Sequence, residues 1–219
     1  VGDGAPVEIV IRPNTVGSES TVWYDNFSDG DDKWKAMQLN GDAVSEEEYG
    51  SAAYDPLTGA DLTNGSGAGS VKIGIGLNKC RNYYTLKDRV NVIGGHTYQI
   101  SAQVKTENAR QTDQVYLSVI FFAKDGTTQI GQDILISDDV KGTHDWIELS
   151  ETLTAPENAA YMRIDVSGRG MTEGAAEKQG AVWYDDVRVT SKLSNPDFEE
   201  SEKGVGTNWT TADISSDSA

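Results

Sequence analysis

The sequence contains one cysteine, Cys80, and two histidines, His96 and His144. A single cysteine cannot form a disulfide within the chain, and a lone thiol is usually a small buried side chain. The histidines lie 48 positions apart (144 − 96), and no Cys or His accompanies them at the spacing of a zinc site. These scarcities argue against redox chemistry and against a zinc centre.

Long apolar runs are missing as well. The longest uninterrupted one, residues 119–123, is much shorter than the roughly 20 residues that a membrane-spanning helix needs. The N-terminus lacks a basic region followed by an apolar one, so we expect any secretion signal to lie upstream of Val1 or to have been removed. The sequence therefore indicates no insertion into a membrane.

Basic residues are outnumbered by acidic ones. The chain has 18 Lys and Arg against 35 Asp and Glu, which gives a net charge of −17. A charge of this sign and size repels phosphate backbones and anionic lipid headgroups. We therefore expect no nucleic-acid partner, and we expect any polymeric ligand to be neutral rather than anionic.

Helical patterns are short and rare, whereas period-two alternation of apolar and polar residues is common. The alternating segments are rich in Val, Ile, Tyr and Thr, and turn-forming Gly, Asp and Pro separate them. They cover residues 70–77, 98–105, 114–123, 146–153, 161–166 and 181–189. This pattern predicts an all-β fold, an antiparallel β-sandwich.

A short repeat bears on the domain organisation. The pentapeptide VWYDN at residues 22–26 recurs as VWYDD at residues 182–186, an interval of 160 residues (183 − 23) that is typical of tandem modules. We therefore assign residues 26–190 to one complete sandwich module and residues 191–219 to a linker and the start of a following module. Residues 1–25 are either the C-terminal strands of a preceding module or extra strands of the central one.

Four segments together resemble the carbohydrate-binding modules of families 4, 9, 16 and 22, the CenC-like group. In order along the chain they are GSGAGSVKIGIG, NVIGGHTYQISAQVKTE, DWIELSETLTAPENAAYMRIDV and AVWYDDVRV. The resemblance implies a jelly-roll sandwich of the galactose-binding-domain-like type. The opening of the module departs from the family, because Asn-Phe-Ser-Asp at residues 26–29 replaces the usual Asn followed by Phe-Glu.

The resemblance also implies a function. It implies a non-catalytic, monomeric module that binds a polysaccharide, with a neutral β-glycan favoured by the charge. It further implies that the module belongs to a larger, secreted or cell-surface, bacterial enzyme that degrades glycans. Two alternatives stay open, namely a catalytic jelly-roll glycosidase or polysaccharide lyase, and an adhesin or spacer module of a cell-surface protein.

Aromatic and amide side chains on outward faces are the candidates for sugar binding. Sugar rings lie on Tyr or Trp through their C–H faces, while their hydroxyls form hydrogen bonds with polar side chains. Alternation along the expected strands turns Gln103, Tyr116 and Phe122 outward, and one of two adjacent tyrosines must also point away from the core. The candidate residues are therefore Arg81, Asn82, Tyr83, Tyr84, Gln103, Tyr116 and Phe122. An outward tyrosine is also common on ordinary protein surfaces.

Acidic residues gather at both ends of the central module. Members of the resembled group commonly hold a structural calcium ion between these ends, and calcium prefers carboxylate and carbonyl oxygens. Asp29 and Asp186 are the expected ligands, although acidic turn residues are often merely solvated.

No catalytic constellation stands out from the sequence. A glycosidase needs two carboxylates at a defined separation in a cleft, and 35 acidic residues produce many accidental pairs. The serine elbow, the phosphate loop and the dinucleotide fingerprint are all missing from the sequence. We therefore expect this part of the protein not to be an enzyme.

Overall fold

The computed structural model describes residues 19–39, 51–60, 69–76, 80–137, 140–171 and 180–192, together with two short strands at 201–202 and 205–206. These residues form strands and no helix, which confirms the all-β prediction. The described part accordingly holds no helix that could cross a lipid bilayer.

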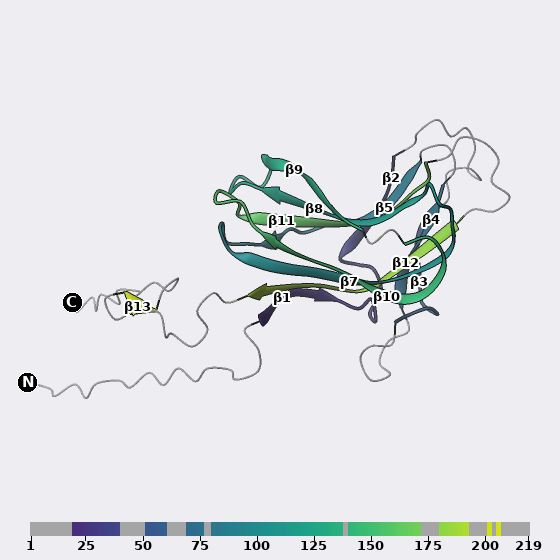
Figure 1. Ribbon diagram of the computed structural model, residues 1–219, viewed down its shortest axis with the longest axis horizontal. Helices are drawn as coiled ribbons and strands as arrows, with labels where there is room; N and C mark the ends of the chain where they lie inside the picture. Colours follow the sequence, from purple (N-terminus) through teal and green to yellow (C-terminus); the bar gives the residue numbers. More distant parts are fainter. Residues whose placement is uncertain are drawn as a thin grey trace, which may run out of the picture.

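Two six-stranded antiparallel sheets lie face to face and form a sandwich (Figure 1). In sheet A, the lower layer of Figure 1, the order is β10 (Gly142–Thr154), β7 (Thr97–Ala109), β12 (Gly180–Lys192), β4 (Ser70–Ile75) and β3 (Ala52–Asp55), with β1 (Glu19–Asp25) also paired to β12. In sheet B, the upper layer, the order is β2 (Trp34–Leu39), β5 (Arg81–Leu86), β11 (Tyr161–Arg169), β8 (Gln114–Phe122) and β9 (Gln129–Ile136), with β6 (Val90–Asn91) also paired to β11. A separate pair is formed by β13 (Ser201–Glu202) and β14 (Val205–Gly206).

The core lies between the two sheets and follows from strand alternation. In β7, every second side chain from Tyr98 to Val104 is buried. In β11 of the other sheet, Met162, Ile164 and Val166 are fully buried. Burying a side chain of this size stabilises the fold by about 1.5–3 kcal/mol. The inward-facing side chains of these strands therefore form the core that holds the two sheets together.

One glycine lets the sheets approach closely near the end of β11. A Cβ atom at Gly168 would lie 3.1 Å from a methyl group of Val182 and 3.2 Å from side-chain carbons of Ile73 and Ile75. Those three residues belong to sheet A, whereas Gly168 belongs to sheet B. The position has no room for a larger side chain without a shift of the facing strands.

The N-terminal boundary of the sandwich differs from the one expected at residue 26. β1 pairs with β12 from Glu19, opposite Lys192, to Asp25, opposite Val187. Residues 19–25 are therefore extra strand residues of the central sandwich, which was one of the two alternatives, and both copies of the VWYD repeat lie in neighbouring strands of one sheet. Residues 1–18 lie outside the described part, and the assignment of residues 191–219 to a following module stays a prediction.

Side chains of β1 also tie this strand to sheet B. The Asp25 carboxylate accepts hydrogen bonds from Trp34 Nε1 at 2.9 Å and from the Phe27 amide at 3.3 Å. The ring of Trp23 meets that of Trp34 edge-on, with 5.6 Å between their centroids. Trp34 is buried and begins β2, so these contacts connect the two layers.

We expect a chain that begins at Asn26 to be less stable than one that begins at Glu19. The shorter chain loses the backbone pairing with β12, the packing of Trp23 and the carboxylate of Asp25. The combined loss in the free energy of unfolding should be on the order of 3 kcal/mol or more. Urea and thermal melts of the two chains measure the difference, and equal midpoints would show that β1 contributes nothing to the sandwich.

Candidate functional site

The outer face of sheet B carries most of the side chains predicted to contact a ligand. Strand register places Tyr116 of β8, Ser167 of β11 and Tyr83 of β5 side by side across this face. The next row along the strands consists of Ser118, Asp165 and Thr85, in the same order. The face continues toward one end of the strands with Arg81 and Arg169, and toward the other with Arg163 and Phe122.

Arginine side chains lie over the aromatic rings of this face. The guanidinium carbon of Arg81 is 4.2 Å from the ring centroid of Tyr83 and 5.4 Å from that of Tyr116. The guanidinium carbons of Arg89 and Arg163 lie 4.2 Å and 5.6 Å from the ring centroid of Phe122. Tyr116 and Phe122 are each only 5% exposed, although both point away from the core. These distances are those of cation–π contacts, so the rings support the guanidinium groups from below.

A buried carboxylate orients two of these arginines. Asp165 is 1% exposed and lies between Arg163, whose Nε is 3.2 Å from Oδ1, and Arg81, whose Nη2 is 3.5 Å from Oδ2. Arg81 also donates to Ser167 Oγ from Nε at 3.2 Å and from Nη2 at 2.9 Å. Two guanidinium groups are thus held in defined positions by one carboxylate and one hydroxyl, before any ligand binds.

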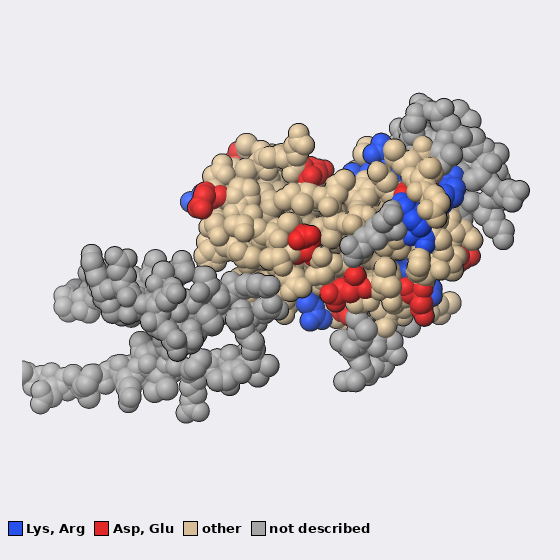
Figure 2. Space-filling model, in the orientation of Figure 1, with Lys and Arg blue, Asp and Glu red and all other residues tan. Residues whose placement is uncertain are grey.

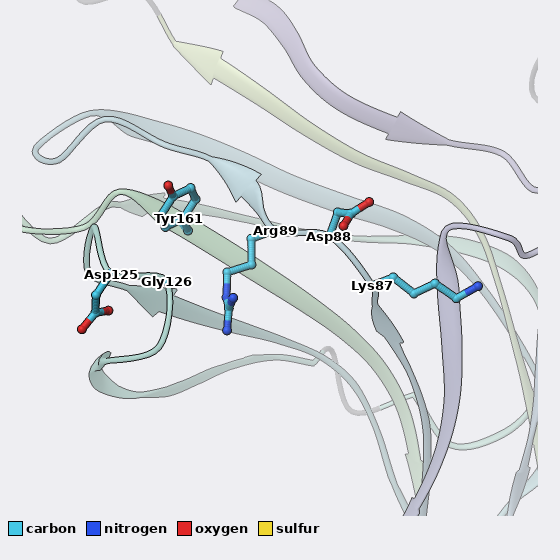
Figure 3. Close-up of a pocket in the computed structure, with 6 residues that line it drawn as sticks. All are labelled: Lys87, Asp88, Arg89, Asp125, Gly126 and Tyr161. Atoms are coloured by element: carbon cyan, nitrogen blue, oxygen red, sulfur yellow. The ribbon is translucent and has the colours of Figure 1, made fainter.

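A pocket of about 370 Å³ lies next to Phe122 at the end of this face. Its lining residues are Lys87, Asp88, Arg89, Asp125, Gly126 and Tyr161. Figure 3 shows the Arg89 side chain reaching into the space beside Tyr161 and the Asp125–Gly126 turn, while Lys87 and Asp88 point away from that turn. The pocket continues the outer face of sheet B, because Tyr161 pairs with Phe122 across the strands.

Asp125 is the acidic group on the turn side of this pocket. Its carboxylate accepts hydrogen bonds from the Thr128 hydroxyl and from the amides of Thr127 and Thr128. These bonds, the one from the Thr128 hydroxyl most of all, lower the pKa of Asp125 to about 2. The carboxylate is therefore charged at neutral pH, and its main partners are groups of its own turn.

The structure brings together four of the seven residues predicted to bind carbohydrate. Arg81, Tyr83, Tyr116 and Phe122 all lie on the outer face of sheet B. Tyr83 is the outward member of the adjacent tyrosine pair, as the alternation required. Their contact with a ligand stays a prediction.

The other three residues do not belong to this face. Tyr84 is 2% exposed, points between the sheets and donates its hydroxyl to Asp31 Oδ2 at 2.9 Å. Burial and this bond raise the pKa of Tyr84 well above its usual value. Asn82 is buried and donates to the Gly74 carbonyl at 2.8 Å. Gln103 lies in β7, which belongs to sheet A. The sequence did not reveal this, since alternation along one strand does not show which sheet the strand joins.

Several residues of the face were not predicted from the sequence. Arg163, Asp165 and Ser167 occupy alternate positions of β11, opposite to its buried Met162, Ile164 and Val166. That alternation is visible in the sequence and could have indicated Arg163 and Asp165 as outward-facing residues. Arg89 and Tyr161 come from a loop and a strand end, and only the folded chain shows that they line one pocket.

The expected calcium ligands are not grouped as a metal site. Among the described residues, no three His, Cys, Asp or Glu side chains are placed to hold one ion. The Asp186 carboxylate accepts a hydrogen bond from the Tyr24 hydroxyl and lies 3.7 Å from Arg188 Nη2. Asp29 is exposed. The side chains of Asp29 and Asp186 therefore do not by themselves fit a calcium site.

Asp185, next to Asp186, is a buried carboxylate with no ion pair to a described Lys or Arg. It accepts hydrogen bonds from the amides of Ala60 at 2.8 Å and Asp186 at 2.6 Å. Burial raises the pKa of Asp185 to about 6, with smaller contributions in the same direction from the carboxylates of Asp186 and Asp25. The folded state therefore keeps a proton on this group up to a higher pH than the unfolded chain does.

We expect this group to make the fold less stable as the pH rises from 5 to 7. In the folded state Asp185 holds a proton below about pH 6, whereas in the unfolded state it holds one only below its ordinary pKa of 3.8. The free energy of unfolding should therefore fall by on the order of 1 kcal/mol between pH 5 and pH 7. Urea melts of wild type and Asp185→Asn at both pH values, with a chelator present, measure it. An unchanged pH dependence in the variant would contradict the assignment.

No protein-family model and no curated protein matches the sequence. Among solved structures, the chain is similar to a fragment of xylanase 10B from Clostridium thermocellum that holds modules CBM22-1 and GH10 in complex with xylohexaose. The identity is 21%, the TM-score is 0.51, and the match covers 80% of this chain and 29% of that chain. The C-terminal family 22 carbohydrate-binding module of the same xylanase matches with 15% identity and a TM-score of 0.50, over 78% of this chain and 94% of that chain.

A third similar structure is the enzymatically active domain of tailspike protein 4 from bacteriophage CBA120. It matches with 13% identity and a TM-score of 0.52, over 75% of this chain and 20% of that chain. The chain thus spans less than a third of the tailspike chain and of the xylanase fragment. Similarities at these identities establish the fold, and they include family 22, one of the families that the sequence resembles.

Proposed function

We propose that the chain is a non-catalytic carbohydrate-binding module that binds a polysaccharide on the outer face of sheet B. The observation that supports the proposal is the gathering of Arg81, Tyr83, Tyr116 and Phe122 on one face of the sandwich. The guanidinium groups stacked on these rings, and the hydroxyl group of Ser167 beside them, suit the oxygens of a sugar chain. The fold that the chain shares with xylan-binding modules supports the same conclusion.

The proposal also covers the larger protein of which this module would be a part. The xylanase fragment joins a module of this fold to a GH10 module in one chain, and that arrangement motivates a glycan-degrading parent enzyme. We propose that the parent protein is a bacterial one that is secreted or held at the cell surface, and that the module acts as a monomer. In this arrangement the module keeps the enzyme close to its polymer.

A structural calcium ion at the acidic end of the sandwich is a further part of the proposal. The ligands expected from the sequence are Asp29 and Asp186, and Asp186 would exchange its contacts with Tyr24 and Arg188 for the ion. The ion would offset the buried negative charge there and stabilise the fold.

Calcium should therefore raise the melting temperature through mass action, by several degrees between a chelator and millimolar calcium. The increase should be absent in Asp186→Ala. Scanning calorimetry of both proteins under both conditions measures it. A wild-type melting temperature that does not respond to calcium would contradict the proposal.

Binding without cleavage is the direct test of the module's function. Affinity electrophoresis and calorimetry against β-glucan, xylan, mannan and pectin should find a polysaccharide that binds, and reducing-end assays should find no product. Tyr83→Ala removes a ring from the face together with the support of Arg81. We expect it to weaken binding by on the order of 1–3 kcal/mol, roughly 5- to 150-fold.

Tyr24→Ala is the matched control, because Tyr24 lies in sheet A with the guanidinium carbon of Arg188 4.7 Å from its ring centroid. It should leave binding unchanged. Equal losses in the two variants would reject the outer face of sheet B as the site. Turnover of the polymer would point instead to a catalytic jelly roll, and no binding to any polysaccharide would point to an adhesin or a spacer.

A further inference from the structure

The charge of the outer face of sheet B is opposite to that of the whole chain. The chain has a net charge of −17, but the basic side chains of this face and its pocket outnumber the acidic ones. Among the described residues, the basic ones are Lys35, Arg81, Lys87, Arg89, Arg163 and Arg169, and the acidic ones are Asp88, Asp125, Asp133 and Asp165. In the edge-on view of Figure 2, both basic and acidic side chains lie at the end of the sandwich that carries β2, β4 and β5.

Within the described residues, few carboxylates pair with these basic groups. Asp165 is shared by Arg81 and Arg163, so one carboxylate serves two guanidinium groups. Arg89 has a ring contact with Phe122 and no ion pair with any residue in the described ranges. The Asp125 carboxylate in the same pocket is already bonded to Thr127 and Thr128. An anion is the ligand that would complete this arrangement.

The aromatic rings are covered by guanidinium groups rather than left bare. A neutral sugar that stacks on protein needs an open ring face for its C–H groups. Here Arg81 lies over Tyr83 and Tyr116, and Arg89 lies over Phe122. A guanidinium group stacked in this way keeps its N–H donors at its edge, where they can bind a carboxylate with two parallel hydrogen bonds.

We propose that the outer face of sheet B, together with the pocket at Arg89, binds an acidic polysaccharide through the carboxylates of its uronic-acid units. This inference rests on the proposed function and replaces the neutral ligand that the net charge of the chain suggests. The net charge acts over about one Debye length, roughly 8 Å at physiological salt. Direct pairs between guanidinium and carboxylate groups act at contact, so the local charge of the face decides which polymer binds.

The pocket gives this ligand a place to anchor. Its volume of about 370 Å³ lies within the range of small-ligand sites, and Arg89 reaches into it (Figure 3). Arg163 lies on the pocket side of the face, whereas Arg81 comes from the opposite end of β11's partner strand and reaches back toward the middle. Asp165 holds both guanidinium groups, and Ser167 holds that of Arg81 as well. A chain with one uronate at Arg89 and the following units across β11 and β5 would meet all three arginines.

Polygalacturonate and its fully methyl-esterified form separate the two ligand classes, because esterification removes the charge and keeps the sugar chain. Affinity electrophoresis and calorimetry of the full chain should show at least tenfold tighter binding to polygalacturonate than to the ester or to xylan. Dextran sulfate serves as the sulfated comparison and should bind more weakly. Binding of dextran sulfate as tight as that of polygalacturonate would overturn the carboxylate assignment.

Arg89→Gln is the informative variant, because Arg89 has no ion pair in the described part of the chain whose loss would disturb the fold. It should lower the affinity for polygalacturonate about fivefold or more and leave the melting temperature unchanged. Arg188→Gln makes the same change in net charge on sheet A and should have no effect on binding. Equal effects of the two variants would overturn the placement of the ligand on this face.

The outcomes also separate this inference from the proposed function. Binding of xylan or of the ester, with polygalacturonate bound no more tightly, would overturn the acidic ligand and keep the carbohydrate-binding module. Failure of every polysaccharide to bind would overturn both. Loss of polygalacturonate binding in Arg89→Gln, with Arg188→Gln unaffected, would support both.

Discussion

The packing of two sheets on a shared apolar core is the constraint on which the rest of this structure depends. Burying Met162, Ile164 and Val166 of β11 sends the alternate residues Arg163, Asp165 and Ser167 to the outside. Register with β5 and β8 then sets Tyr83 and Tyr116 beside Ser167. The candidate site is thus the outward half of the same strands whose inward half stabilises the fold, and a one-residue slip in β11 would exchange the two.

Electrostatics acts on two scales in this molecule. The chain as a whole is strongly acidic, yet three of its arginines lie on the paired strands β5 and β11, and a carboxylate that is 1% exposed orients two of them. A buried ion pair contributes little to stability by itself, because desolvation offsets the attraction between the charges. Asp165 is better understood as a positioning group, which fixes Arg81 and Arg163 on rings that already support them.

Predictions from the sequence succeeded where the residue pattern of a single strand was enough to make them. Alternation identified Tyr116 and Phe122 as outward residues. The presence of a single cysteine indicated the buried thiol of Cys80. The sequence misplaced Tyr84 and Gln103, because which of two adjacent tyrosines faces the core, and which sheet a strand joins, depend on pairing between distant segments. The repeated VWYD motif suggested tandem modules, and its two copies lie in the neighbouring strands β1 and β12 of one sheet.

The sequence by itself determined the all-β architecture, because period-two patterning and turn residues are local properties of the chain. It also indicated the strands that carry the aromatic residues. Only the tertiary structure decided that Arg81, Arg89 and Arg163 gather over those rings, since they come from β5, a loop and β11. Net charge is a sum over all residues, whereas a ligand meets the few charges that folding brings to one face.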